Sequence, residues 1–370
     1  MIAAMPVTDR KDRFYEIDLL RFLAALAVVL YHYTFRGFAE GGYSPVEYPI
    51  IGDYFKYGSY GVQLFFIISG FVILMTATKR GAAHFVISRI TRLYPAFWVC
   101  VSLTALVIAW KGGALFQVDL IQYLLNLSMI SGFAGVEMVD GVYWTLLVEL
   151  KFYALIFVLL IIGQIQRIEW FLALWLAITA ASFVLAMPKI VTFIFLTEWS
   201  AYFIAGALFY LIRQKGLNVF RGLMLWASFM LAILGNLQQL GALEAMYHSD
   251  FSPYVTSIMI AGFYIVFLLI AFGKTQHLSS EKLVKLGVLT YPLYLIHQNI
   301  GFIIYHQFGD VVNRYVLLVG LVLVMMLAAW LIHKLIEQPL GRWMNNVLKG
   351  LWERVQITLE NKKATASQLP

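Results

Sequence analysis

The chain has 370 residues, of which 61% are hydrophobic and only 13% are charged. A water-soluble domain usually carries about 25% charged residues, so this composition excludes a soluble globular protein and indicates an integral membrane protein. The net charge of +7 comes from short basic clusters between apolar segments, which is typical of membrane orientation and argues against nucleic-acid binding.

The apolar segments predict an all-α integral membrane protein, a bundle of about ten transmembrane helices. Crossing the hydrocarbon core takes about 20 mostly apolar helical residues. Segments that meet this rule lie near residues 17–36, 58–77, 93–110, 143–163, 168–187, 197–212, 222–237, 254–273, 286–306 and 315–335. Residues 115–133 are apolar enough to predict a short re-entrant or interfacial helix.

The basic residues orient this layout. With the N-terminus in the cytoplasm, the inner segments hold 20 of the 27 Lys and Arg residues and the outer segments hold five. Because cytoplasmic loops carry an excess of Lys and Arg, both termini are predicted to be cytoplasmic. No small-residue cleavage site follows the first apolar segment, which is therefore predicted to be a retained span and not a signal peptide.

Three parts are expected along the chain. Residues 1–14 form a cytoplasmic segment and residues 15–339 form the transmembrane domain. In residues 340–370, apolar side chains recur at helical spacing among Lys and Arg. This pattern predicts an amphipathic helix lying in the inner membrane interface, followed by a disordered tail.

The first span contains three ionisable residues, Asp18, Arg21 and His32. Such groups are costly inside a membrane, which makes them functional candidates. On a helix, Arg21 and His32 lie about 20° apart in azimuth and about 16 Å apart along the axis. Asp18 is one turn from Arg21 and is expected to pair with it. The alternative is structural: Arg21 snorkels or locks a helix contact, and His32 bonds to a neighbouring span.

The second span and the loop after it carry two further patterns. Ser69 and Gly70 in GVQLFFIISGF are typical of a close helix contact, because small residues let backbones approach. Arg89 and Arg92 share one helix face just before Pro95. Two guanidinium groups there suit a phosphate-bearing ligand, because arginine binds phosphate with paired hydrogen bonds. An orientation signal or a lipid-headgroup contact is the alternative for both arginines.

Two later spans add polar residues. Glu149 is expected near the depth of His32, where a carboxylate would orient the imidazole of a catalytic dyad; a structural salt bridge or hydrogen bond is the alternative. Tyr294 and His297 share one face of the ninth span and are predicted to line a substrate tunnel, although His297 also fits a buried structural histidine. No metal site is predicted, because no pair of histidines has metal-ligand spacing and Cys100 is the single cysteine.

Taken in chain order, these patterns resemble the acyltransferase-3 family of bacterial membrane O-acyltransferases, which modify O-antigen, exopolysaccharide and related glycans. The resemblance covers roughly Tyr15 to Pro339. Its motifs are Arg21-x10-His32 preceded by Asp18, GVQLFFIISGF, Arg89-x-x-Arg92-x-x-Pro95, WTLLVELKFY with Glu149, YPLYLIHQ with His297, and IEQP with Glu337 and Pro339. Each motif alone is weak, whereas six in order are a specific signal.

The resemblance implies that His32 and Arg21 are essential and that the donor is an acyl-coenzyme A, such as acetyl-coenzyme A. It also implies that Arg89 and Arg92 hold this donor at the cytoplasmic side. We therefore expect a multi-pass protein of the bacterial inner membrane with no permanently bound cofactor. Its expected partners are acyl-coenzyme A, a glycan or lipid-linked sugar and membrane lipids, and not nucleic acid.

A polytopic exporter or transporter of a glycan or small solute is the alternative function. Helices broken at Gly or Pro favour transport, and Pro292 lies in the ninth span near its inner end. Dependence on the coenzyme distinguishes the two, because a transporter does not consume acetyl-coenzyme A.

Overall fold

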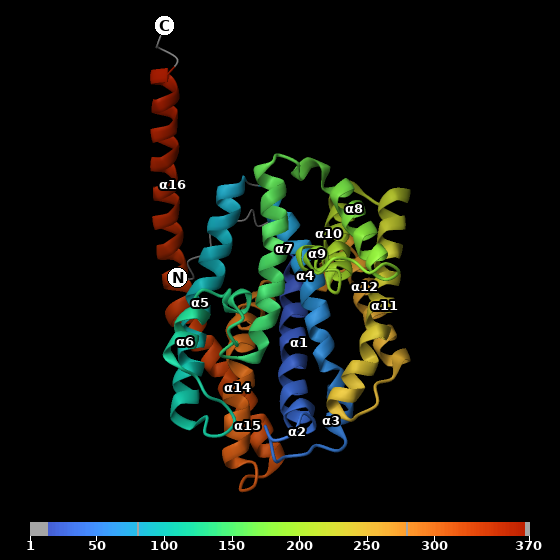
Figure 1. The fold of residues 1–370 in the computed structure, drawn as a ribbon, viewed down its shortest axis with the longest axis vertical. Helices are drawn as coiled ribbons and strands as arrows, with labels where there is room; N and C mark the ends of the chain where they lie inside the picture. Colours follow the sequence, from blue (N-terminus) through green and yellow to red (C-terminus); the bar gives the residue numbers. More distant parts are fainter. Residues whose placement is uncertain (1–13, 80, 279, 367–370) are drawn as a thin grey trace.

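The computed structural model describes residues 14–79, 81–278 and 280–366, which form helices and loops without a β-strand, as the sequence predicts (Figure 1). Among these residues, eight helical segments are long and apolar enough to cross a membrane. They are Tyr15–Ala39, Ile51–Ala77, Ala82–Lys111, Gly141–Ile161, Lys189–Lys215, Val219–Tyr247, Pro253–Ala271 and Arg314–Thr358. The protein is therefore a multi-pass helical membrane protein.

Within the described residues, sixteen α-helices make up these segments and the connections between them. Their bounds are α1 Tyr15–Tyr31, α2 Gly37–Ala39, α3 Ile51–Phe55, α4 Gly61–Ala77, α5 Ala82–Lys111, α6 Leu120–Asn126, α7 Trp144–Ile161, α8 Ile168–Ser182, α9 Lys189–Phe195, α10 Ser200–Lys215, α11 Val219–Tyr247, α12 Pro253–Ala271, α13 Val284–Gly287, α14 Thr290–Phe308, α15 Arg314–Ile332 and α16 Gln338–Ala366. Two π-helical segments, His32–Arg36 and His333–Glu337, join α1 to α2 and α15 to α16.

Eight of the ten predicted spans coincide with these segments, and the other two differ for physical reasons. Within residues 168–187, only Ile168–Ser182 are helical, as α8, and these 15 residues are short for a bilayer crossing. Residues 286–306 correspond mainly to α14, which has 19 residues and carries His297, Gln298 and Asn299. Since α14 is buried along most of its length and packs against α1, α5 and α15, it faces protein, where polar side chains can be satisfied.

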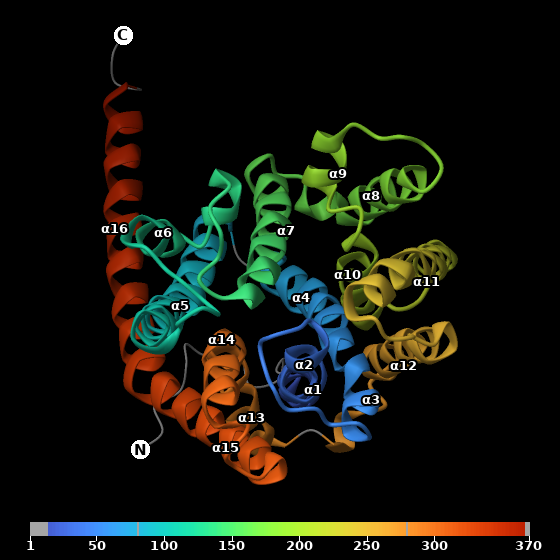
Figure 2. The ribbon, with the colours of Figure 1, turned by 60° about the horizontal axis from the view of Figure 1, so that its bottom comes forward.

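Helix α1 lies near the centre of one half of the bundle, where it packs against α4, α13 and α14 (Figure 2). The second half contains α8, α10, α11 and α12, and α4 joins the halves through its close contact with α10. The polar residues of α1 therefore face other helices and not lipid, as their stripe predicts.

Helix α5 begins at Ala82, well before the span predicted at residues 93–110, because the residues that precede Pro95 are also helical. Arg89 and Arg92 thus lie within a long helix and not in a loop. The short helix predicted within residues 115–133 is present as α6, and the loop after it bonds to α5. There, the Tyr94 hydroxyl donates to the carbonyl of Ser128 at 2.9 Å.

The C-terminal helix is also present. Helix α16 continues from α15 through the second π-helical segment and extends beyond the rest of the bundle (Figure 1). Its exposed apolar side chains include Trp343, Val347, Leu351, Trp352 and Val355, the residues that make the sequence amphipathic. The predicted N-terminal segment, apart from Phe14, and the end of the predicted tail lie outside the described residues.

Helices α4 and α10 approach each other more closely than an alanine would allow. A Cβ atom on Gly70 would overlap the carbonyl oxygen of Phe203, and one on Gly206 would overlap that of Ile67. The predicted small-residue contact is therefore confirmed at Gly70, where α10 supplies the second glycine, whereas the Ser69 hydroxyl bonds to Glu149.

Gly206→Ala is consequently expected to destabilise the protein by about 1–3 kcal/mol or more, because the two backbones must separate. Thermal unfolding in detergent would measure the change. Gly262→Ala in α12 is the matched control, since a Cβ atom there meets nothing within 4 Å. Equal melting temperatures for the two variants would contradict this account of the contact.

Candidate functional site

A cavity lies among α1, α4, α5, α7 and α14, each of which contributes to its wall. It holds about 690 Å³ of space, including its open mouth. Apolar side chains such as Phe65 and Val72 form part of the wall. The polar lining consists of Arg21, Ser69, Arg89, Thr145, Glu149, Tyr153, Thr290, Tyr291 and Tyr294.

Arg21 and Glu149 are the charged residues of the middle of the cavity. The Glu149 carboxylate accepts a hydrogen bond from the Ser69 hydroxyl at 2.6 Å. Arg21 lies close enough to Glu149 and Asp18 for both carboxylates to act on its charge. Its Nε atom is buried and has no hydrogen-bond partner among the described residues. This guanidinium therefore retains a donor for a ligand in the cavity.

The two arginines of α5 differ in their surroundings. The Arg92 guanidinium pairs with the Glu337 carboxylate, which also lies 2.8 Å from the imidazole Nδ1 of His333. Arg89 lines the cavity with its guanidinium 5.9 Å from the ring centroid of Tyr153 and has no carboxylate partner among the described residues. Of the two, Arg89 is therefore the one placed to bind an anionic ligand.

Thr145 and Tyr294 separate the cavity from a buried pair of histidines. Their hydroxyls are 2.9 Å apart, and the Tyr294 ring packs with its centroid 5.6 Å from that of His297. On the far side of Tyr294, the Nε2 atom of His297 is 3.2 Å from the Nδ1 atom of His32. Tyr294 thus lines the cavity and also contacts His297.

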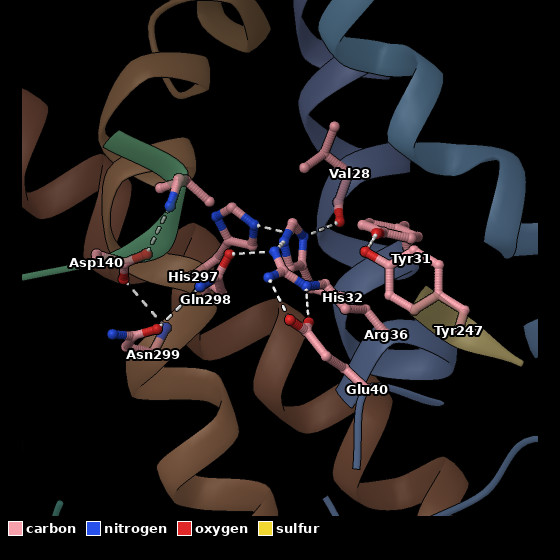
Figure 3. A network of polar contacts seen from close by, with 11 residues as sticks. Val28, Tyr31, His32, Arg36, Glu40, Asp140, Tyr247, His297, Gln298 and Asn299 are labelled. Atoms are coloured by element: carbon pink, nitrogen blue, oxygen red, sulfur yellow. Dashed lines mark hydrogen bonds and ion pairs between the residues drawn. The ribbon is translucent and has the colours of Figure 1, made fainter. Parts of the chain in front are cut away.

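Hydrogen bonds to backbone carbonyls fix the tautomers of the two imidazoles, and Figure 3 shows the one between His32 and Val28. The Nδ1 atom of His32 is 2.7 Å from the carbonyl oxygen of Val28, and that of His297 is 2.8 Å from the carbonyl oxygen of Tyr294. A carbonyl oxygen only accepts, so both Nδ1 atoms carry hydrogen and both Nε2 atoms carry a lone pair. The Nε2 atom of His32 is consequently available as a base.

Arg36 faces that base. Its Nη1 atom is 3.2 Å from Nε2 of His32 and donates to the Oε1 atom of Gln298 at 3.1 Å. Its Nε atom pairs with the Glu40 carboxylate, and Nη2 donates to the same carboxylate at 3.3 Å (Figure 3). His32 is 4% exposed, whereas the side chains of Arg36 and Glu40 are 22% and 23% exposed. The ion pair therefore forms the more accessible edge of the site.

Asp140 supports the part of α14 that carries these residues. Its carboxylate accepts from the backbone N–H of Asn299 at 3.1 Å and from that of Val142 at 3.2 Å. Burial raises the pKa of this loop carboxyl to about 7. The Tyr33 hydroxyl adds a hydrogen bond to the carbonyl of His297 at 2.7 Å.

The structure brings together some of the predicted residues and separates others. Arg21, Arg89, Glu149 and Tyr294 share the cavity, as expected of a substrate path. The predicted pairing of Glu149 with His32 is wrong: Glu149 bonds to Ser69, and the ring that contacts His32 is that of His297. Glu149 lines the cavity, whereas His32 lies outside the lining, beside His297.

The sequence does not single out Arg36 or Gln298 as site residues. Arg36 is one of the five basic residues assigned to the outer side, at the end of the first predicted span. A usable signal exists nonetheless, because His32, Arg36 and Glu40 follow each other at i,i+4 spacing. The π-helical segment continues the helix through these residues, and such segments often occur at functional sites.

Comparison with known proteins agrees with the motifs. A family model described as an acyltransferase domain matches residues 14–334. The chain is similar to nodulation protein 10 of Rhizobium leguminosarum bv. viciae, with 30% identity over 237 residues, which cover 56% of the chain but only 63% of that protein. It is also similar to the exopolysaccharide production protein ExoZ of Rhizobium meliloti (strain 1021), with 26% identity over 257 residues. These residues cover 66% of the chain and 77% of that protein. No solved structure gives a significant match.

Proposed function

The chain belongs to the acyltransferase domain family, and from that premise we propose that it moves an acyl group from acyl-coenzyme A to a glycan hydroxyl. The acceptor would be a cell-surface glycan, an exopolysaccharide or a lipid-linked precursor. The observation that carries this proposal is the cavity lined by both Arg89 and Tyr294, because the Tyr294 ring also contacts His297 of the His32–His297 pair.

The cavity suits a long donor with an anionic head. Arg89 would bind a phosphate of the coenzyme at the cytoplasmic side. Arg21, with its unpartnered Nε–H, and Glu149 would bind polar groups of the arm that follows. The thioester would reach the histidines after Tyr294 turns aside, and apolar residues such as Phe65 would pack on the acyl group.

His32 would act as the general base. Its Nε2 atom takes the proton of the acceptor hydroxyl, and the hydroxyl oxygen attacks the thioester carbonyl. Collapse of the tetrahedral intermediate breaks the carbon–sulfur bond, and the proton passes from His32 to the departing sulfur. The products are one ester and one thiol. His297 would orient His32 through the contact at Nδ1, the role that the sequence suggests for Glu149.

The acceptor class is supported by the relatives. The name of the second relative associates that protein with exopolysaccharide production. We therefore propose a glycan acceptor that approaches from the outer side of a bacterial inner membrane, with both termini in the cytoplasm.

Inside-out membrane vesicles that contain the native acceptor and receive radiolabelled acetyl-coenzyme A would test the proposal. We expect label to appear on glycan together with stoichiometric release of free coenzyme thiol. Movement of glycan across the membrane without thiol release would instead support the transporter.

Arg89→Gln is expected to raise the KM for acetyl-coenzyme A about 10- to 100-fold, because a hydrogen bond to a charged group contributes about 1.5–3 kcal/mol. The kcat at saturating donor should change little. Arg167→Gln is the control, since Arg167 is exposed and lies outside the cavity lining. An unchanged KM in Arg89→Gln would remove Arg89 from the donor site.

A further inference from the structure

We propose that Arg36 is a catalytic residue of the acceptor half of the site, where it binds the attacking hydroxyl and then the oxyanion of the tetrahedral intermediate. This role rests on the proposed acyl transfer. It follows from the position of Arg36 against the one nitrogen of His32 that can act as a base.

Access to the base leads past Arg36. The Nδ1 side of His32 is covered by Val28 and His297, and its ring packs against that of Tyr31 at a centroid distance of 4.8 Å. The Nε2 side faces Arg36, whose side chain is partly exposed. A hydroxyl must come within about 2.6–3.2 Å of Nε2 to lose its proton there. It must therefore lie beside the guanidinium, with its oxygen accepting from Nη1 and its hydrogen directed at Nε2.

The same N–H donor becomes available when negative charge develops. In the structure, Nη1 of Arg36 donates to the lone pair of Nε2. A hydroxyl that binds with its hydrogen on Nε2 replaces this hydrogen bond, and the released N–H donates to the hydroxyl oxygen. When that oxygen attacks and its proton moves to Nε2, the same N–H can bind the oxyanion that forms at the thioester carbon. A donor already held in place at that moment stabilises the transition state strongly.

Neighbouring residues keep the guanidinium in this position. Glu40 holds Nε and Nη2, while Gln298 accepts from Nη1, so the group cannot rotate freely. Glu40 also neutralises the Arg36 charge beside an imidazole that must become cationic. Glu40 and Gln298 are accordingly positioning residues, and Arg36 is the residue that touches the reacting atoms.

The test measures initial rates of labelled acetyl transfer in vesicles against both donor and acceptor concentration. Arg36→Gln is expected to lower kcat about 100- to 1,000-fold, as removal of an oxyanion donor does, with the KM for acetyl-coenzyme A unchanged. Arg36→Lys should retain part of the lost activity, and added methylguanidinium should partly restore Arg36→Gln. Arg314→Gln is the control, because Arg314 bonds to the Glu47 carbonyl and not to the histidines.

A double variant separates catalysis from structure. Arg36→Gln leaves Glu40 without its ion-pair partner, which alone could disturb the site. Arg36→Gln with Glu40→Gln removes that unpaired charge. If Arg36 is catalytic, the double variant stays as slow as Arg36→Gln. Recovery of wild-type kcat in the double variant, or wild-type kcat in Arg36→Gln itself, would overturn the proposal. Absence of transfer by the wild-type protein would instead overturn the proposed function on which it rests.

Discussion

His32→Gln is expected to lower the rate of acyl transfer by roughly 10²- to 10⁴-fold, because general-base catalysis contributes a factor of that size. Glutamine can still donate to the Val28 carbonyl, as Nδ1 of His32 does, but it has no lone pair that takes a proton near neutral pH. The affinity for acetyl-coenzyme A should stay within about twofold of the wild type, since His32 does not line the cavity.

Two further histidine variants sharpen that experiment. His297→Gln should slow transfer by a smaller factor than His32→Gln, because His297 only orients the base. His277→Gln is the matched control, since His277 is exposed in a loop region. Expression and membrane insertion must match those of the wild type. Full activity in well-inserted His32→Gln would show that another group removes the proton.

Arg92→Met is expected to destabilise the fold by about 3–5 kcal/mol, because it leaves the carboxylate of Glu337 buried without its cation. Glu337 is only 5% exposed, and its other charged contact is His333. The double variant Arg92→Met with Glu337→Leu should recover much of the loss, since replacing a buried ion pair by apolar residues is often neutral. Thermal unfolding in detergent would measure both variants.

An exposed ion pair provides the comparison for Arg92. Lys215 is 50% exposed and pairs with Glu169 at 3.1 Å, so Lys215→Gln should cost less than about 1 kcal/mol. If Arg92→Met melts like the wild type but loses affinity for acetyl-coenzyme A, then Arg92 binds the donor as the sequence suggests. The ion pair with Glu337 would then contribute little to the stability of the fold.

Helical periodicity predicts which residues of one helix share a face, and it succeeds at that level. Arg21 lines the cavity and His32 lies beyond it on the same helix, as their calculated azimuths require. Periodicity does not show which neighbouring helix packs against that face. Equal depth in the membrane predicts that Glu149 reaches His32, whereas Glu149 bonds to Ser69 and the imidazole beside Nδ1 of His32 is that of His297.

Local chemistry overrides the apolar criterion at two positions that matter for the site. Arg36 lies at the end of the first predicted span, and the π-helical segment keeps it beside His32. Helix α14 is not among the eight segments that are apolar enough to cross a membrane, although the sequence predicts a span at residues 286–306, because it carries His297, Gln298 and Asn299. In both cases the polar residues that interrupt the apolar pattern are the ones that build the site.

The hydrogen-bonded hydroxyls of Thr145 and Tyr294 would also keep the bundle from leaking protons. The cavity is open at one end, and the acceptor would reach the histidine pair from the opposite side of the bundle. A continuous column of water between the two would conduct protons across the membrane. The hydroxyl pair, with the ring of Phe65 packed edge-on against Tyr294 at a centroid distance of 5.7 Å, interrupts such a water column. A donor that displaces the Tyr294 side chain would itself fill the space that this side chain leaves. In the proposed reaction, the membrane would therefore hold its proton gradient while the thioester reaches the histidines.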